Sequence, residues 1–327
     1  MTAPEIDVLF PVRQARTSLP EALGDILAQR EVTLRVLAVV DLGPAGEDDG
    51  SRAWLEARAR EEPRLIVLPG EGRGAAAALQ LALEQVRAPL LSHMEADDRC
   101  PPERLARLHA ALTPQLDGVT SRVEFLGEPS PGMQRYLAWQ NSLLSGARMA
   151  AERFLEIPAL HQTGLYRSEV VRAVGGYVPR GPWPVDIDFW FRWFAHERAV
   201  TKLAEPLYAW RQHSEQSTRS GGAHGRASLR AAKLHALAEH LRARDGGPPP
   251  LHLLAHGRAL KRWRKALTDA GLAPDTQHEW HPLESARAPS LPTEGVLLAV
   301  YGMADQRAAA RAALGALPEP QRLIFTG

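Results

Sequence analysis

Apolar runs of strand length alternate with helix-like segments over the first hundred residues. The runs, rich in Val, Ile and Leu, occupy residues 6–12, 34–40, 64–68 and 88–94. Helical spacing of apolar side chains appears between them, at residues 19–29, 53–60 and 75–86. Strands that alternate with helices predict a mostly parallel sheet flanked by helices on both faces. Ligands of such sheets bind at the carboxyl ends of the strands.

The alternation becomes less regular further along the chain. Residues 117–126 predict another strand, and a helix is expected after Pro101 and Pro102, with Asp98 as a candidate N-cap. Helices are also expected at residues 133–155, from Ser168 to the glycine pair at 175 and 176, at 186–197 and at 228–244.

The stretch "DGGPPP" at residues 245–250 is typical of a linker. Beyond it, strand and helix patterns alternate again over about 80 residues, near the lower limit for independent folding. The chain is therefore predicted to hold one large α/β domain at residues 1–245 and a small one at residues 246–327.

Composition excludes several classes of protein. Of the 327 residues, 45% are hydrophobic and 24% are charged, which suits a soluble globular protein. Lys plus Arg number 39 against 38 Asp plus Glu, so no net charge favours nucleic acid. No leader-like start and no apolar run of roughly 18 residues occurs, so no transmembrane segment is expected. The single Cys100 is typical of a reducing compartment. We expect a cytoplasmic location, with peripheral attachment at the inner membrane face as an option.

The acidic sequence "EADD" follows the run at residues 88–94 directly. Glu95 and Asp97 are two residues apart, so an extended backbone points both carboxylates the same way. Carboxylates that converge at a strand end suit a hard divalent cation such as Mg²⁺ or Mn²⁺. Asp41 follows the second run and is expected at the same edge. The alternative for the cluster is a solvated turn with a helix cap.

Several motifs, in order, resemble those of family 2 glycosyltransferases with the GT-A fold. The match spans roughly residues 5–220. It rests on Pro11-Val12, "VVDLG", "GEGRGAAAALQ", "EADD" with "PPERL", "GLYRSEVVRAVGGY", "VDIDFWFRW" and "PLYAWRQHSEQST". The resemblance implies a nucleoside-diphosphate sugar as donor, with UDP-sugars favoured, and a glycan or lipid-linked acceptor. It also implies a role in surface polysaccharide or glycoconjugate synthesis.

The resemblance implies a donor site at the strand ends. Asp41 would accept a hydrogen bond from a uracil or guanine ring, and Arg73 would reach a phosphate or the ribose. Glu95 would contact the ribose or a metal-bound water, and Arg211 would balance the leaving diphosphate. The implied donor set is Pro11, Val12, Asp41, Arg73, Glu95, Asp97 and Arg211.

The other implied roles concern metal, acceptor and catalysis. Asp97 and His213 would hold Mn²⁺ or Mg²⁺, while His161 and Trp183 would contact the acceptor. The catalytic carboxylates fall on Asp186 and Asp188. Asp186 is expected to be the general base of an inverting single displacement.

Three positions depart from the family pattern: Leu42, Glu95 and Val185 stand where a second Asp, an Asp and a Glu are common. These departures leave open a non-catalytic protein that binds nucleotide sugars or glycans. A nucleotidyltransferase is a further alternative, although "PVRQARTSLPEAL" lacks the Gly-rich, basic signature expected after its first strand.

The C-terminal unit resembles the first half of a nucleotide-binding Rossmann domain. Its glycine fingerprint is reduced to "HGRALKRW", and without glycines the backbone cannot approach a pyrophosphate closely. We expect a non-catalytic unit that serves in docking or homodimerisation.

Overall fold

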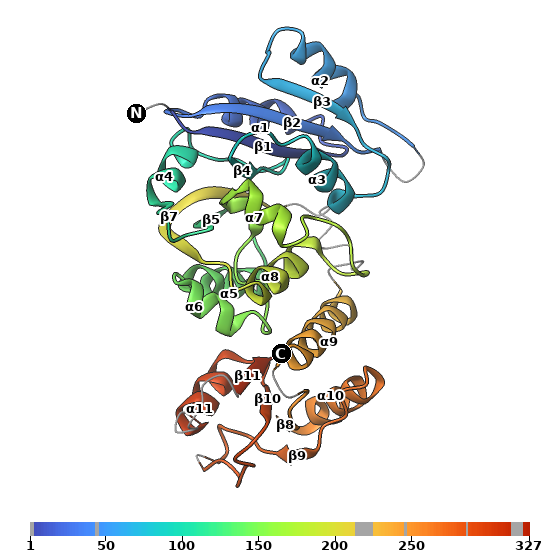
Figure 1. Ribbon diagram of the computed structural model, residues 1–327, viewed down its shortest axis with the longest axis vertical. Coiled ribbons are helices and arrows are strands. Elements are labelled where there is room, and N and C mark those ends of the chain that lie inside the picture. Colours follow the sequence, from blue (N-terminus) through green and yellow to red (C-terminus); the bar gives the residue numbers. More distant parts are fainter. Residues whose placement is uncertain (1–2, 43–45, 213–224, 245–246, 286, 315–322) are drawn as a thin grey trace. The chain divides into compact units, whose positions relative to one another are not determined.

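The computed structural model forms two compact units. It describes residues 3–42, 46–212, 225–244, 247–285, 287–314 and 323–327. The first unit comprises Met1–Met149 and Pro158–His224, and the second comprises Ala150–Ile157 and Gly225–Gly327 (Figure 1). The C-terminal unit therefore begins earlier than residue 246 and includes a short segment from the middle of the chain.

A seven-stranded sheet organises the first unit, in the order β3-β2-β1-β4-β6-β5-β7. Its strands are β1 (Glu5–Val12), β2 (Thr33–Val40), β3 (Leu65–Pro69), β4 (Leu90–His93), β5 (Gly118–Leu126), β6 (Leu165–Arg167) and β7 (Val200–Arg211). Only β6 pairs antiparallel to its neighbours β4 and β5. The predicted mostly parallel α/β sheet is confirmed.

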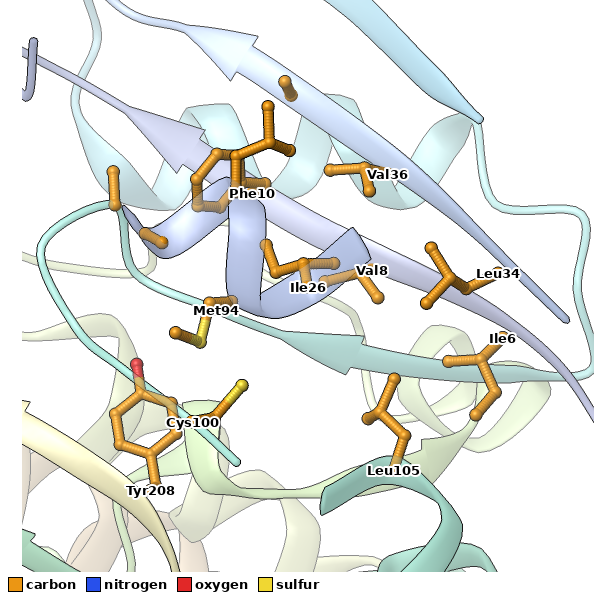
Figure 2. Close-up of a cluster of buried hydrophobic side chains, with 14 of the residues drawn as sticks. Ile6, Val8, Phe10, Ile26, Leu34, Val36, Met94, Cys100, Leu105 and Tyr208 are labelled. Carbon is orange, nitrogen blue, oxygen red and sulfur yellow. The ribbon is translucent and has the colours of Figure 1, made fainter. Parts of the chain in front are cut away.

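Helices cover both faces of this sheet. The helices in this part of the chain are α1 (Leu19–Leu27), α2 (Ser51–Ala59), α3 (Ala75–Glu84), α4 (Arg104–Ala111), α5 (Pro131–Ser142), α6 (Gly146–Glu152), α7 (Ser168–Ala173) and α8 (Val185–Ala195), with the 3₁₀ turn η1 (His161–Thr163). The last three residues of α6 belong to the second unit. Alternate residues of β1 and β2 share one apolar cluster with α1, α2 and α4 (Figure 2). Helix α3 contacts the same two strands without entering that cluster, so it covers the opposite face.

The region after β5 differs from the sequence-based prediction. The helix expected at residues 133–155 is broken between α5 and α6, because Ser145 bridges to Thr201 of β7. Gly146 permits this approach, since a Cβ there would lie 2.3 Å from the Val200 carbonyl oxygen. Strands β6 and β7 were not predicted. The first has three residues, and the second contains polar side chains and a proline.

The second unit is a smaller α/β layer. A parallel four-stranded sheet has the order β11-β10-β8-β9. Its elements are α9 (Arg226–Arg242), β8 (Leu251–Ala255), α10 (Gly257–Asp269), β9 (Thr276–Glu279), β10 (Val296–Val300), α11 (Ala304–Leu314) and β11 (Leu323–Thr326). Strand β9 was not predicted. Among the described helices of both units, none has the length and apolar character needed to cross a bilayer.

Two glycines of the first unit should respond oppositely to substitution by alanine. A Cβ at Gly118 would lie 2.5 Å from the buried ring of Tyr166, whose neighbours include Trp193. We expect Gly118→Ala to lower the free energy of unfolding by about 1–3 kcal/mol. Gly24 lies inside α1 with open space around it, so Gly24→Ala should raise that energy by about 0.4–1 kcal/mol. Denaturant unfolding measures both, and equal effects would contradict the packing described.

Candidate active site

The carboxyl ends of several strands meet at one edge of the large sheet. Strands β1, β2 and β4 run parallel, so Val12, Asp41 and the residues after His93 lie at the same edge. The backbone N–H of Asp41 donates to the carbonyl of Val12 over 2.8 Å. The expected meeting of Asp41 with the acidic cluster at one edge of the sheet is therefore confirmed.

Asp41 holds the glycine-containing segment that follows β3. Its buried carboxylate accepts hydrogen bonds from the backbone N–H groups of Gly72 (2.7 Å) and Gly74 (2.8 Å). Both glycines have positive φ, which other L-residues rarely adopt. Between them, Arg73 is exposed and forms an ion pair with Glu71. This segment therefore lies fixed beside the end of β2, with its arginine facing solvent.

The acidic cluster divides into buried and half-buried members. Asp98 is 1% exposed and accepts hydrogen bonds from the Tyr208 hydroxyl and the Arg211 backbone N–H, both at 2.7 Å. Burial and the neighbouring Asp97 carboxylate raise the pKa of Asp98 well above its ordinary value. Asp97 is half-buried, and its carbonyl oxygen accepts from Arg211 Nε over 2.5 Å. Asp98 therefore brings the end of β7, and with it Arg211, against Asp97.

The suggested capping role of Asp98 is wrong. Helix α4 begins at Arg104, and Glu103 occupies its N-cap position. Both carboxylate oxygens of Asp98 instead accept hydrogen bonds from residues of β7. A buried carboxylate requires hydrogen-bond donors, and Tyr208 and Arg211 provide them.

Two buried histidines, His93 and His161, lie next to Glu95. His93 was not among the residues predicted for the site. His93 Nε2 is 3.1 Å from Glu95 Oε1, and His93 Nδ1 is 2.9 Å from His161 Nε2. Burial, with the charge of Arg104 nearby, lowers the pKa of His93 to about 3. Burial also lowers the pKa of His161 well below its ordinary value. Both rings are thus neutral near pH 7, and the Glu95 carboxylate lies beside His93 without an ion pair to it.

His161 was expected to line an acceptor pocket, but it is only 3% exposed. Its ring packs near Tyr177 and Phe189, at centroid distances of 5.7 and 5.9 Å. Phe189 belongs to α8, so the histidine pair joins the acidic cluster to the helix that carries the candidate catalytic carboxylates. In this structure His161 supports the site from within the core. One feature of the sequence could have identified His93 as a residue of the site, because it is a histidine inside an otherwise apolar run.

The arginine of "PPERL" is also buried. Arg104 donates to the His93 carbonyl and the Ser92 hydroxyl, both at 3.1 Å, and to the Gln162 carbonyl at 2.5 Å. Its guanidinium carbon lies 5.1 Å from the centroid of the Tyr208 ring. Arg104 therefore fixes the end of β4 against η1 and β7, a role that the motif alone did not reveal.

The two aspartates at the start of α8 have different surroundings. Asp186 is half-buried, and its Oδ1 accepts from the N–H of Ile187 over 2.9 Å. Asp188 is 4% exposed and pairs with Arg180 (2.9 Å) and Arg192 (2.8 Å). Burial would raise the pKa of Asp188, but the two arginines outweigh it and the net pKa is lowered.

Asp188 organises the loop before α8. Trp183 donates its indole N–H to Asp188 Oδ1 over 3.3 Å. Arg192 in turn donates to the carbonyls of Val174 and Gly176. The adjacent Trp190 and Trp193 are 1% and 0% exposed and belong to the core. Asp188 is thus part of the scaffold, and Trp183 is anchored to it.

The metal site is only partly described. His213 lies outside the described residues. Within those residues, no group of three or more His, Cys, Asp or Glu side chains could hold a metal ion. Asp97 offers oxygen chemistry suited to a hard cation, and the repulsion within the cluster, which raises the pKa of Asp98, would be relieved by one. A cation bound by Asp97 would therefore need further ligands beyond this carboxylate.

Comparison with known proteins identifies the family. Residues 7–175, more than half of the chain, match the model of glycosyl transferase family 2, and the protein belongs to this family of glycosyltransferases. No curated protein sequence matches the chain.

Solved structures share the fold at low sequence identity. TarS 1–349 from S. aureus is 15% identical with a TM-score of 0.54, and the match covers 74% of this chain and 66% of that one. The chain spans about half (49%) of the longer TarS structure. TarS 1–349 has also been solved with UDP-GlcNAc (TM-score 0.54, 14% identity, 82% and 84% coverage). The mannosyltransferase PcManGT from Pyrobaculum calidifontis, in complex with GDP-Man and Mn²⁺, is 19% identical, with a TM-score of 0.50 and coverage of 97% and 82%. The GT-A fold predicted for the large domain is confirmed.

Asp188 and Asp186 should differ in their effect on stability. We expect Asp188→Asn to lower the free energy of unfolding by about 3 kcal/mol, because Arg192 would remain buried without the carboxylate that pairs with it. Asp186→Asn, at a half-buried position, should change it by less than about 1 kcal/mol. Thermal unfolding at pH 7 measures both.

The pH dependence gives a second test of Asp188. Its pKa is lowered on folding, so its carboxylate stabilises the protein above the ordinary Asp range and loses that effect as the pH falls through and below it. The stability difference between parent and Asp188→Asn should therefore shrink on acidification. A difference that is independent of pH would contradict the ion pairs described.

Proposed function

We propose that the protein transfers a sugar, with inversion, from a nucleoside-diphosphate sugar to an acceptor hydroxyl with the help of a divalent cation. The observation that carries the proposal is the meeting of half-buried Asp97 with Arg211 at the carboxyl edge of the sheet, through the buried Asp98. Arg211 holds the main chain of Asp97 and also pairs with Glu21 over 3.1 Å, so a guanidinium lies next to the residue that carries the candidate metal-binding carboxylate. This arrangement would suit a metal-bridged diphosphate, whose negative charge grows as it departs.

The donor would lie along this edge. Asp41 and the glycine segment are proposed to receive the nucleotide, and the fixed backbone beside Arg73 supports that role. Pro11 and Val12 would form the floor at the end of β1. Glu95, whose backbone N–H donates to the Tyr208 hydroxyl, is proposed to contact the ribose. The relatives' complexes with UDP-GlcNAc and GDP-Man support a nucleotide sugar without choosing the base, and a UDP-sugar remains our first choice.

The chemical step is assigned to Asp186. Its carboxylate would take the proton of the acceptor hydroxyl, the oxygen would attack the anomeric carbon, and the bond to the diphosphate would break. Trp183, anchored to Asp188, is proposed to contact the acceptor sugar. A cation held by Asp97, with His213 as a further ligand, would neutralise the diphosphate as it leaves.

The biological setting belongs to the proposal as well. We propose that the acceptor is a glycan or a lipid-linked molecule and that the reaction belongs to surface polysaccharide or glycoconjugate synthesis. We also propose a cytoplasmic location. The proposed homodimer would form through the second unit. Release of nucleoside diphosphate from a panel of UDP- and GDP-sugars, measured with and without Mn²⁺ against candidate acceptors, tests the proposal. Pyrophosphate formation from a nucleoside triphosphate would instead favour a nucleotidyltransferase.

Asp97→Ala should abolish the Mn²⁺-dependent part of UDP binding, because it removes the best-matched metal ligand. Calorimetry with and without Mn²⁺ measures the effect. Glu56→Ala, at an exposed carboxylate of α2, serves as the control and should bind like the parent. Equal Mn²⁺ dependence in Asp97→Ala and the parent would remove Asp97 from the site.

Asp186→Asn should slow transfer by about 10²–10⁴-fold, the usual contribution of a general base. Asp186 does not cap α8, whose N-cap position is held by Pro184. Donor affinity should change little, because Asn keeps the size of the side chain and an oxygen that can accept from the N–H of Ile187. Asp188→Asn should matter less to the chemical step once rates are scaled to folded protein. Near-parent transfer by Asp186→Asn together with an inactive, folded Asp188→Asn would show that the base was assigned to the wrong carboxylate.

A further inference from the structure

A groove in the second unit is lined by cationic side chains from two helices. It has a volume of about 500 Å³, within the range of small-ligand sites. Helix α9 contributes Arg230, and α10 contributes the remaining charged groups. These are Arg258, Lys261, Arg262, Lys265 and Asp269. Five cations thus face one carboxylate.

The sequence of α10 explains why these charges gather on one side. Trp263 and Leu267, four residues apart, are 3% and 0% exposed and anchor the helix to its sheet. The four cations of α10 are spaced i, i+3, i+4 and i+7, which places them on the opposite face in a stripe about 10 Å long. All four are exposed. The four cations therefore form a stripe on the face of α10 that points away from the core, and this stripe lines the groove together with Arg230.

The stripe is poorly neutralised by the protein itself. Lys265 Nζ lies 2.8 Å from Asp269 Oδ2. No ion pair to a described residue is formed by Arg230, Arg258, Lys261 or Arg262. Like charges three or four residues apart destabilise a helix, so the arrangement weakens α10 unless an anion occupies the groove.

We propose that this groove binds a multivalent phosphate group, such as a di- or triphosphate or a phosphomonoester headgroup. Guanidinium groups donate paired N–H groups that match the oxygens of a phosphate, and lysines add charge from any direction. Three arginines and two lysines along an open groove suit a highly charged anion that reaches them from solvent.

The groove extends well beyond the dinucleotide position of a Rossmann-like unit and meets it only at Arg258. That position lies at the start of the helix after the first strand, here near Gly257, where the glycine fingerprint is missing. The groove instead follows the flank of α10 as far as Asp269 and includes α9. The missing glycines therefore do not argue against it, because its contacts come from side chains.

The test uses the full-length protein, with inorganic tripolyphosphate as probe in EDTA. Arg262→Glu should weaken binding by about 10-fold or more in calorimetry. Arg264→Glu is the matched control, since Arg264 is an exposed arginine of the same helix that does not line the groove. It should change the affinity by less than about 2-fold. Arg262→Gln, which removes the charge without reversing it, should give an intermediate loss.

Vesicle sedimentation distinguishes the two sources of phosphate. Vesicles of phosphatidylcholine with phosphatidic acid are compared with phosphatidylcholine alone, using the same variants. Loss of vesicle binding in Arg262→Glu alone, without measurable tripolyphosphate binding, supports a lipid headgroup. The reverse result supports a soluble phosphate compound. No binding by the parent in either assay, or equal losses in Arg262→Glu and Arg264→Glu, would overturn the proposal.

Discussion

One buried carboxylate holds together the sheet edge that carries the candidate active site. Asp98 accepts hydrogen bonds from Tyr208 and from the backbone of Arg211, so the ends of β4 and β7 are joined although two other strands separate them in the sheet. Removing a carboxylate from water is costly, and these two donors compensate much of that cost. The positions of Asp97 and Arg211 depend on this junction, and so does the charge distribution around the diphosphate of the proposed donor.

The charged groups of the candidate site are of two kinds: buried groups that hold the fold together and half-buried carboxylates that solvent can reach. Arg104, Asp98 and Asp188 are buried and engaged with partners fixed by the fold. Asp97 and Asp186, next to or near these groups in sequence, are only half-buried. A buried charge that loses its partner destabilises a protein strongly, whereas a half-buried carboxylate can exchange partners at modest cost. The sequence motifs mix both kinds, so a motif position does not by itself indicate a role in the reaction.

The sequence predicted what is local and left out what depends on distant contacts. Periodicity located β1, β2 and β4 and most helices, because their apolar patterns are carried by neighbouring residues. The break between α5 and α6 depends on a bridge to Thr201, and the pairing of His93 with His161 joins residues far apart in the chain. Family motifs located the acidic cluster and the carboxylates of α8. They could not tell that Asp98 is tied to β7 or that Asp188 is enclosed by two arginines.

The neutral histidine pair affects how kinetic measurements on this enzyme can be interpreted. Transitions in a pH–rate profile are often assigned to histidine when they fall near neutrality, since its ordinary pKa lies there. Here burial lowers the pKa of His93 to about 3, and that of His161 also lies well below the ordinary range. A kinetic transition between pH 6 and 8 would therefore not come from either of these two histidines, although they lie beside the acidic cluster.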